Sequence, residues 1–305
     1  MHYSGPTAAY AYEAIDVQNM YAFLWCSMPE RLQHTIVRCL TGCAMIKSDR
    51  VFLLGPSHHL ASLRRIALPA STKYDTPLGP LAVDQEIVAA LRAQQQMAFG
   101  DITSEQEADE HSLEMHLPFI QKIFARSPSF FIWVCWCKRN KKAEAQRERE
   151  TPSRAKKDVT LVPLMVGHLS EQQCERYGEV LAPYLNDPRN LFVISSDFCH
   201  YGARFDFELQ PRKEEKIWQA VEALDRQGMG VIEREQQLDA WLAYCDETGN
   251  TVCGRMPIAV LLATLQKSDP SWSVHFVKYD QSSRCMTRKD SSVSYASAIA
   301  CVKTT

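Results

Sequence analysis

The sequence has none of the features that mark a membrane, secreted or disulfide-stabilised protein. No apolar run reaches the roughly 18 residues that a membrane-spanning helix needs, and no signal-peptide pattern opens the chain. The 11 cysteines are scattered without the regular spacing of a disulfide framework. We therefore expect a cytoplasmic protein in a reducing compartment, with no membrane insertion.

An excess of charge of one sign is also missing. Lysine and arginine number 34, aspartate and glutamate number 36, and the net charge is -2. No overall field therefore favours nucleic acid. The basic half of residues 138–157 is a local exception, but no aromatic stacking platform is interleaved with it. We expect this run to be solvated and the protein to bind no nucleic acid.

The chain does contain a large apolar fraction with mixed patterning. Its 305 residues are 46% hydrophobic and 23% charged, enough to bury a large core as one α/β domain or two smaller ones. Apolar runs predict buried strands, whereas amphipathic segments with caps predict helices. The expected strands include 51–54, 159–166 and 191–194, and the expected helices include 84–97, 170–185, 213–227 and 231–244.

Two adjacent histidines follow the strand expected at 51–54. Gly55 and Pro56 stop this strand abruptly, so His58 and His59 fall at its carboxyl end. Open α/β sheets bind their ligands at that end of the strands. Adjacent imidazoles suit metal binding or acid–base chemistry near neutral pH. The alternative is one packed, hydrogen-bonded histidine and one that faces solvent.

A second histidine-rich stretch, D-E-H-S-L-E-M-H-L-P, spans residues 109–118. Helical spacing places His111 and Glu114 near one face, with His116 as a further candidate. A histidine and a glutamate three residues apart can bind a metal, although this is not the H-E-x-x-H pattern of zinc proteases. We favour the alternative of a polar network that braces a helix start against the sheet.

The strand expected at 191–194 is followed directly by S-S-D-F-C-H-Y-G. Asp197 and His200 therefore lie at another strand end, where a carboxylate and an imidazole can pair as orienting group and base. His59 lies nearby if the two strands are neighbours. We favour this functional pairing over a purely structural one.

Cys253 precedes a helix in which Pro257 is expected to be the first residue. The amino end of a helix and the nearby Arg255 both favour a thiolate. A buried, inert thiol is the alternative, and the pattern does not decide between them.

Parts of the chain fit the α/β pattern badly. A helix is expected over residues 7–15 with no strand ahead of it, so the sheet is expected to lack its first strand and the chain to be truncated at its amino end. Residues 17–48 follow no clean period, and residues 126–157 join an apolar run to a charge-dense one. We interpret both segments as atypical insertions.

Five motifs together resemble the Memo family, whose name refers to receptor-driven cell motility. They are G-P-S-H-H, D-E-H-S-L-E-M-H-L-P, S-S-D-F-C-H-Y-G, N-T-V-C-G-R-M-P-I and D-S-S-V-S-Y-A, in the family's order. The resemblance covers residues 3–16, 49–125 and 158–302.

The resemblance implies a single α/β domain over residues 1–305, an α/β/α sandwich of the LigB-like type found in class III extradiol dioxygenases. Those enzymes hold non-haem iron with two histidines and a carboxylate. The Memo family has a cysteine at the third position. The resemblance implies copper or iron binding, redox signalling, and recognition of phosphotyrosine segments of receptors or signalling adaptors.

Residue by residue, His59 matches the second histidine ligand of the family and Cys253 its cysteine ligand. Asp197 and His200 match further pocket residues, with His200 at the acid–base position. Tyr3 matches an aromatic residue of the pocket. The family's first histidine ligand, on a strand ahead of this tyrosine, has no clear counterpart, so we expect weak metal binding.

Three functions follow from these observations. The first is a Memo-type metal-binding protein whose pocket adds Tyr3, His58, His111 and Glu114 to the residues above. The second is an enzyme that resembles a non-haem iron dioxygenase, against which the softer cysteine ligand argues. The third is a module that binds phosphopeptides without a metal.

Overall fold

The computed structural model describes residues 20–25, 48–95, 97–124, 159–213, 215–269 and 271–303. Tyr3, the helix expected over residues 7–15 and the insertion expected at 126–157 lie outside these ranges.

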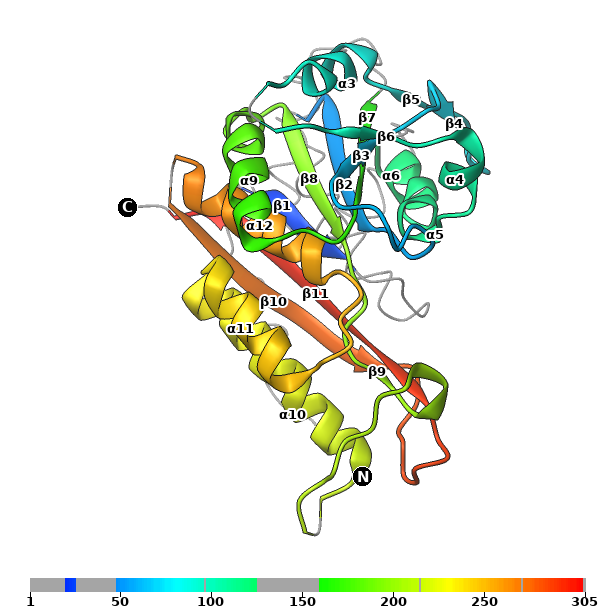
Figure 1. The fold of residues 1–305 in the computed structure, drawn as a ribbon, viewed down its shortest axis with the longest axis vertical. Coiled ribbons are helices and arrows are strands. Elements are labelled where there is room, and N and C mark those ends of the chain that lie inside the picture. Colours follow the sequence, from blue (N-terminus) through cyan, green and yellow to red (C-terminus); the bar gives the residue numbers. More distant parts are fainter. Residues whose placement is uncertain are drawn as a thin grey trace, which may run out of the picture.

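A mixed sheet runs through the described part of the chain (Figure 1). Its main path has the order β10-β11-β1-β8-β2-β7-β3-β6. These strands span Met20–Trp25 (β1), Arg50–Pro56 (β2), Ile66–Leu68 (β3), Gly100–Asp101 (β6), Thr160–Val166 (β7), Asn190–Ser195 (β8), Trp272–Gln281 (β10) and Ser292–Val302 (β11). Off this path lie β4 (Lys73–Tyr74), β5 (Leu81–Val83) and β9 (His200–Tyr201).

The centre of the sheet is parallel. β2 pairs in parallel with β7 on one side and with β8 on the other. All three strands are buried along nearly their whole length, as expected for strands covered on both faces, and their sequences accordingly show no polar side. Antiparallel strands complete the sheet, with β11 beside β1, β10 beside β11, and β3 beside β7.

Helices cover both faces of the sheet, which confirms the predicted α/β/α sandwich. Alternate residues of β2 point to opposite faces, so that Phe52 and Leu54 join one buried cluster whereas Val51 and Leu53 join the other. The first cluster includes residues of α3 (Gln85–Arg92), α9 (Glu171–Leu185), α11 (Leu238–Thr248) and α12 (Arg255–Lys267). The second includes residues of α5 (His111–Glu114) and α6 (Leu117–Phe124).

The α9 helix shows how local signals and close packing combine. It begins after Ser170, which forms the predicted capping box with Gln173. It then packs along α12, where a Cβ built at Gly178 would lie 2.7 Å from the carbonyl carbon of Ala263. Glycine therefore permits the close approach of the two helices.

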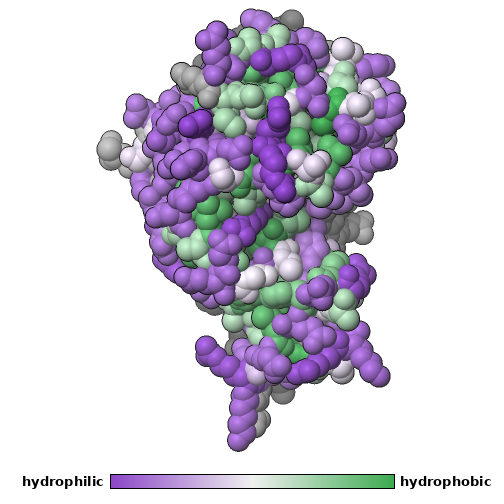
Figure 2. Space-filling view, in the orientation of Figure 1, coloured by the Kyte–Doolittle hydropathy of each residue, from purple (hydrophilic) through white to green (hydrophobic). Residues whose placement is uncertain are grey.

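The remaining helices of the described ranges are α4 (Ser104–Ala108), the short 3-10 helix η2 (Ala203–Phe205) and α10 (Ile217–Gly230), with a π-helical turn η3 (Val231–Glu235) directly after α10. The single helix predicted over residues 231–244 is thus divided between η3 and α11. Within the described ranges, none of the helices has the length and hydrophobicity that crossing a bilayer would require. On the face shown in Figure 2, hydrophilic residues predominate and apolar ones form separate patches.

The segment at 17–48, interpreted as an insertion, contributes a strand to the sheet. Its residues 20–25 form β1 between β8 and β11. Phe23 of β1 is in parallel register with Val193 and in antiparallel register with Ile299. The segment M-Y-A-F-L-W is apolar throughout and shows no alternation, so a search for period two misses it.

Candidate functional site

The candidate site lies beyond the carboxyl ends of two neighbouring parallel strands. His58 and His59 follow β2, and Asp197 and His200 follow β8. β2 and β8 are neighbours in the sheet, so the residues that follow them lie at the same edge of the sheet. Cys253 joins them from the segment immediately ahead of α12.

Two groups of possible metal ligands lie in this region. Asp197, His200 and Cys253 form one group, which we call the cysteine group. His58, Glu110 and His111 form the other, which we call the histidine–glutamate group. Within each group the ligand atoms all lie within 4.8 Å of one another.

The loop after β8 holds Cys253 tightly. The backbone N–H of Asp197 donates a hydrogen bond to Sγ of Cys253 over 3.1 Å. The next residue, Gly254, donates its N–H to Oγ of Ser196 over 3.1 Å. A Cβ at Gly254 would lie 2.2 Å from Cβ of Ser196, so this contact requires glycine.

Cys253 is a neutral thiol in this arrangement. Burial, followed by the negative charge of Asp197, raises the pKa of the thiol to about 12. Arg255, which the sequence suggested as a stabilising cation, instead pairs with Asp246 at 2.8 Å. The helix begins at Arg255, which makes Pro257 its third residue. The structure therefore favours the alternative of a protonated cysteine over a resident thiolate.

His200 is held in one tautomer. Its Nδ1 lies 2.9 Å from the carbonyl oxygens of both Phe198 and Thr251, and because carbonyl oxygens only accept, Nδ1 carries the proton. Nε2 is then left with its lone pair. Burial lowers the pKa of the imidazole, outweighing these two hydrogen bonds. His200 is thus a neutral imidazole whose Nε2 can bind a metal or accept a proton.

A buried carboxylate that the sequence analysis missed supports the His200 segment. Oδ1 of Asp225 accepts hydrogen bonds from the N–H of Cys199 at 3.1 Å and from Nδ2 of Asn250 at 3.0 Å. Its Oδ2 accepts one from the hydroxyl of Tyr279 at 2.9 Å. Burial, only partly offset by these bonds, raises the pKa of Asp225 to about 6.

The signal for Asp225 was present in the sequence. It lies four residues after Val221, an expected inward-facing position of α10, and therefore on the buried face of that helix. The Asp225 carboxylate accepts hydrogen bonds from Cys199, which precedes His200, and from Asn250, which precedes Thr251. It therefore fixes the two backbone segments that flank the imidazole of His200.

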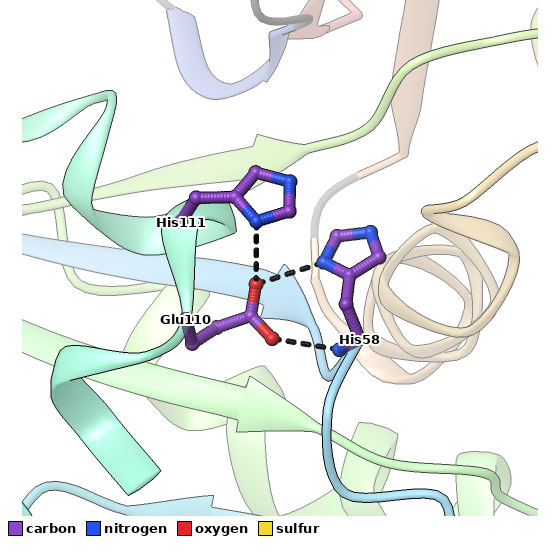
Figure 3. Close-up of side chains that lie close together, drawn as sticks. All are labelled: His58, Glu110 and His111. Carbon is purple, nitrogen blue, oxygen red and sulfur yellow. Dashed lines mark hydrogen bonds and ion pairs between the residues drawn. The ribbon is translucent and has the colours of Figure 1, made fainter. Parts of the chain in front are cut away.

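The histidine–glutamate group is built around Glu110, which is 2% exposed. Its carboxylate accepts hydrogen bonds from the backbone N–H of His58 at 2.6 Å, from Nδ1 of His58 at 2.8 Å and from the N–H of Ser112 at 3.0 Å. Burial raises the pKa of Glu110, but the bonds from His58 and Ser112 prevail and lower it to about 2. Figure 3 shows the carboxylate between the two imidazoles.

Glu110 is the second functional residue that sequence reasoning missed. It is the N-cap of α5, and Ser112 of this helix donates its hydroxyl to the carbonyl of Pro56 at the end of β2 over 2.8 Å. The polar network that we expected to brace a helix start against the sheet is therefore present. It uses Glu110 and Ser112 rather than the pair His111 and Glu114.

The structure brings His58 and His111 together but leaves the other predicted residues of this region outside both ligand groups. The rings of His58 and His111 lie 4.5 Å apart at an interplanar angle of 16°. His59 is exposed, with its ring 6.3 Å from that of His111, and belongs to neither group. Glu114 is exposed, and His116 is buried.

The two groups belong to one electrostatic environment. The charge of His58 contributes to lowering the pKa of His200, after burial, and so does the charge of Arg204. Arg204 is exposed and lies over the ring of Phe205, 4.3 Å from its centroid. Phe205 in turn meets His200 edge-on, with ring centroids 5.1 Å apart.

A solved structure has a similar fold. The crystal structure of the uncharacterized protein JW3007 from Escherichia coli K12 is similar to the chain with a TM-score of 0.53 and 12% sequence identity. The match covers 92% of this chain and 99% of the other. At this identity the similarity concerns the fold alone.

Sequence comparisons are more specific. The chain is 41% identical over 252 residues to Protein MEMO1 of Xenopus tropicalis and 38% identical over 252 residues to that of Homo sapiens, in each case over 81% of this chain and 73% of the relative. It is 38% identical over 256 residues to the Protein memo-1 homolog of Caenorhabditis elegans, over 82% of this chain and 63% of that protein. A family model described as Memo-like protein matches residues 42–299. The chain therefore belongs to the Memo family.

Proposed function

We propose that the chain is a cytoplasmic metal-binding protein of receptor-driven cell motility and redox signalling. The observation that carries the proposal is the cysteine group, in which a thiol, an imidazole and a carboxylate have their ligand atoms within 4.8 Å of one another. Membership of the Memo family supports it, because copper or iron binding and these processes are what the resemblance to that family implies.

The donor set fits a copper or iron ion. Cys253 offers sulfur, which favours soft ions such as Cu(I), and His200 offers an imidazole nitrogen, which suits both metals. Asp197 adds carboxylate oxygen. Such an ion would supply one-electron redox chemistry, while the two carbonyls at Nδ1 of His200 keep its Nε2 directed to bind.

The environment of Cys253 favours weak metal binding. A cysteine must lose its proton to bind a metal, and burial keeps the pKa of Cys253 near 12. The ion must therefore displace a tightly held proton. His59, which matches a family ligand and follows the neighbouring strand β2, remains the proposed additional donor.

Metal titration of the cysteine variants tests this proposal. Cys253→Ala should lower the affinity for buffered Cu(I) or Fe(II) by at least tenfold, roughly the lower limit for disturbing a metal's surroundings. Cys245→Ala is the matched control, since Cys245 is a buried free thiol of α11 that belongs to neither ligand group. Equal affinities for the wild type and Cys253→Ala would refute the proposed metal centre.

We also propose that the site recognises phosphotyrosine segments of receptors or signalling adaptors. Arg204 offers an exposed guanidinium, which can pair with a phosphate through two parallel hydrogen bonds. Phe205 lies beneath this guanidinium and beside His200, and offers an aromatic surface for a tyrosine ring.

Peptide titration separates the two properties. Arg204→Gln should weaken binding of a phosphotyrosine peptide but not of its unphosphorylated form. Arg189→Gln serves as the control, because Arg189 precedes β8 and so lies at the opposite end of that strand. Phosphopeptide binding that is unchanged by chelator and by Cys253→Ala would favour a metal-independent binding module.

A further inference from the structure

We propose that His58, Glu110 and His111 form a second cation site, suited to a borderline divalent ion such as Zn²⁺. The histidine–glutamate group shares no residue with the cysteine group. The inference therefore goes beyond the proposed function and does not depend on it.

The three donors converge on one point. Nδ1 of His58 lies 2.8 Å from Oε1 of Glu110, and Nδ1 of His111 lies 3.7 Å from the same oxygen. Figure 3 shows both nitrogens directed at this carboxylate oxygen. In tetrahedral zinc sites with bonds near 2.0–2.1 Å, neighbouring ligand atoms are about 3.4 Å apart. The two distances lie on either side of that value, so shifts of a few tenths of an ångström would admit the ion.

The charge at the group favours a cation. Glu110 is a buried carboxylate, and a buried charge is costly unless it has a partner of opposite charge. The partners of its Oε1 include two imidazoles, each positively charged only when protonated. A divalent ion held by the three groups would place positive charge directly against this buried carboxylate.

The carboxylate is already oriented by contacts that a metal would leave in place. The backbone N–H groups of His58 and Ser112 both donate to it. Ser112 is fixed in turn by its bond to the carbonyl of Pro56 and by close packing on Gly55, where a Cβ would lie 2.6 Å from Oγ. Such outer contacts hold a ligand in position before the ion arrives.

The site is open on one side. The side chain of Glu110 is 1% exposed, whereas those of His58 and His111 are 29% and 53% exposed. An ion can therefore enter from solvent and keep a coordination position for water or for an anionic ligand.

The donor types set the choice of ion. Two imidazoles with one carboxylate form a set typical of open zinc sites. The absence of a thiolate from this group makes it a poorer site for Cu(I) than the cysteine group. Cu(I) should thus prefer the cysteine group, whereas Zn²⁺ can bind either group unless the thiol is removed.

Calorimetric titration of Zn²⁺ into the Cys253→Ser protein tests the inference without the competing thiol. We expect one zinc per chain. Adding Glu110→Gln should weaken binding at least about 100-fold, since loss of an outer contact alone costs 10- to 100-fold. Asp109→Asn, which removes the same charge from the exposed neighbouring residue, should leave binding unchanged.

Glutamine at position 110 keeps an acceptor for the helix cap, and His111→Phe on the exposed side gives a second variant with the same expected loss. Histidine ring ¹⁵N spectra should show zinc-dependent shifts at Nδ1 of His58 and His111. Loss of all zinc binding in Cys253→Ser would overturn the inference while leaving the proposed function intact. So would unchanged binding in Glu110→Gln.

Discussion

Replacement of Asp225 by asparagine should remove a pH-dependent cost of folding. Asp225 is fully buried, and its pKa rises from an ordinary 3.8 to about 6, chiefly through burial. The folded protein thus holds this proton more tightly than the unfolded chain. The resulting stability is fully present below pH 3.8 and is lost as the pH rises through about 6. The gap of roughly two pH units, at about 1.4 kcal/mol per unit, corresponds to about 3 kcal/mol.

Asparagine fits the same hydrogen-bond network without a charge. Its Oδ1 can keep the donors from Cys199 and Asn250, and its amide can donate to the hydroxyl of Tyr279. That hydroxyl can then donate to Oγ of Ser294, 3.2 Å away. The nearby groups that titrate are Tyr279, Tyr244 and Cys199, and burial raises the pKa of each well above this pH range.

Urea unfolding of the wild type and of Asp225→Asn between pH 4 and 7 measures the effect. The free energy of unfolding of Asp225→Asn, relative to that of the wild type, should increase by about 2–3 kcal/mol as the pH rises through this range. Carboxylates elsewhere titrate equally in both proteins and cancel. Asp239→Asn, which removes an exposed carboxylate of α11, is the control and should change the free energy of unfolding far less across this range. A flat difference for Asp225→Asn, or one of opposite sign, would refute the reasoning.

Other changes test the packing around the site and the fold. Gly254→Ala should destabilise the protein by about 1–3 kcal/mol through overlap with Ser196, measured by thermal unfolding; an unchanged melting temperature would contradict the contact. Thr251→Val removes the hydroxyl that bonds the backbone of His200 and should reduce metal affinity about 10- to 100-fold. Unchanged metal titration would show that this hydroxyl does not position the imidazole. Gly178→Ala should cost about 1–3 kcal/mol in urea unfolding, because a methyl group forces α9 and α12 apart.

The sequence was sufficient where the signal is local. The apolar run at 51–54 predicts a buried strand, and β2 lies there with His58 after its end, but the strand continues through Gly55 and Pro56, which pair with β7 instead of stopping it. The predictions of β8 and of the capping box at Ser170 are confirmed. Backbone preferences and apolar runs act over a few residues, so a strand and the type of residue that follows can be predicted without the fold.

β1 shows the limit of pattern recognition within one segment. Residues 20–25 have no alternation, and their place between β8 and β11 depends on partners about 170 and 280 residues along the chain. A strand without alternation and an irregular apolar insertion have the same local composition. The partner strands decide which of them forms.

The sequence by itself determined the α/β class, the strand ends that carry the site, and most of the residue types that line it. Only the tertiary structure determined which polar groups are buried away from water and which partners they contact. Glu110 meets His58 across 52 residues, and Asp225 meets Tyr279 across 54. The charge state of Cys253 likewise follows from burial beside Asp197 rather than from its place ahead of a helix. The desolvation of a polar side chain depends on how the whole molecule packs around it, whereas strand and helix preferences depend on a few neighbouring residues.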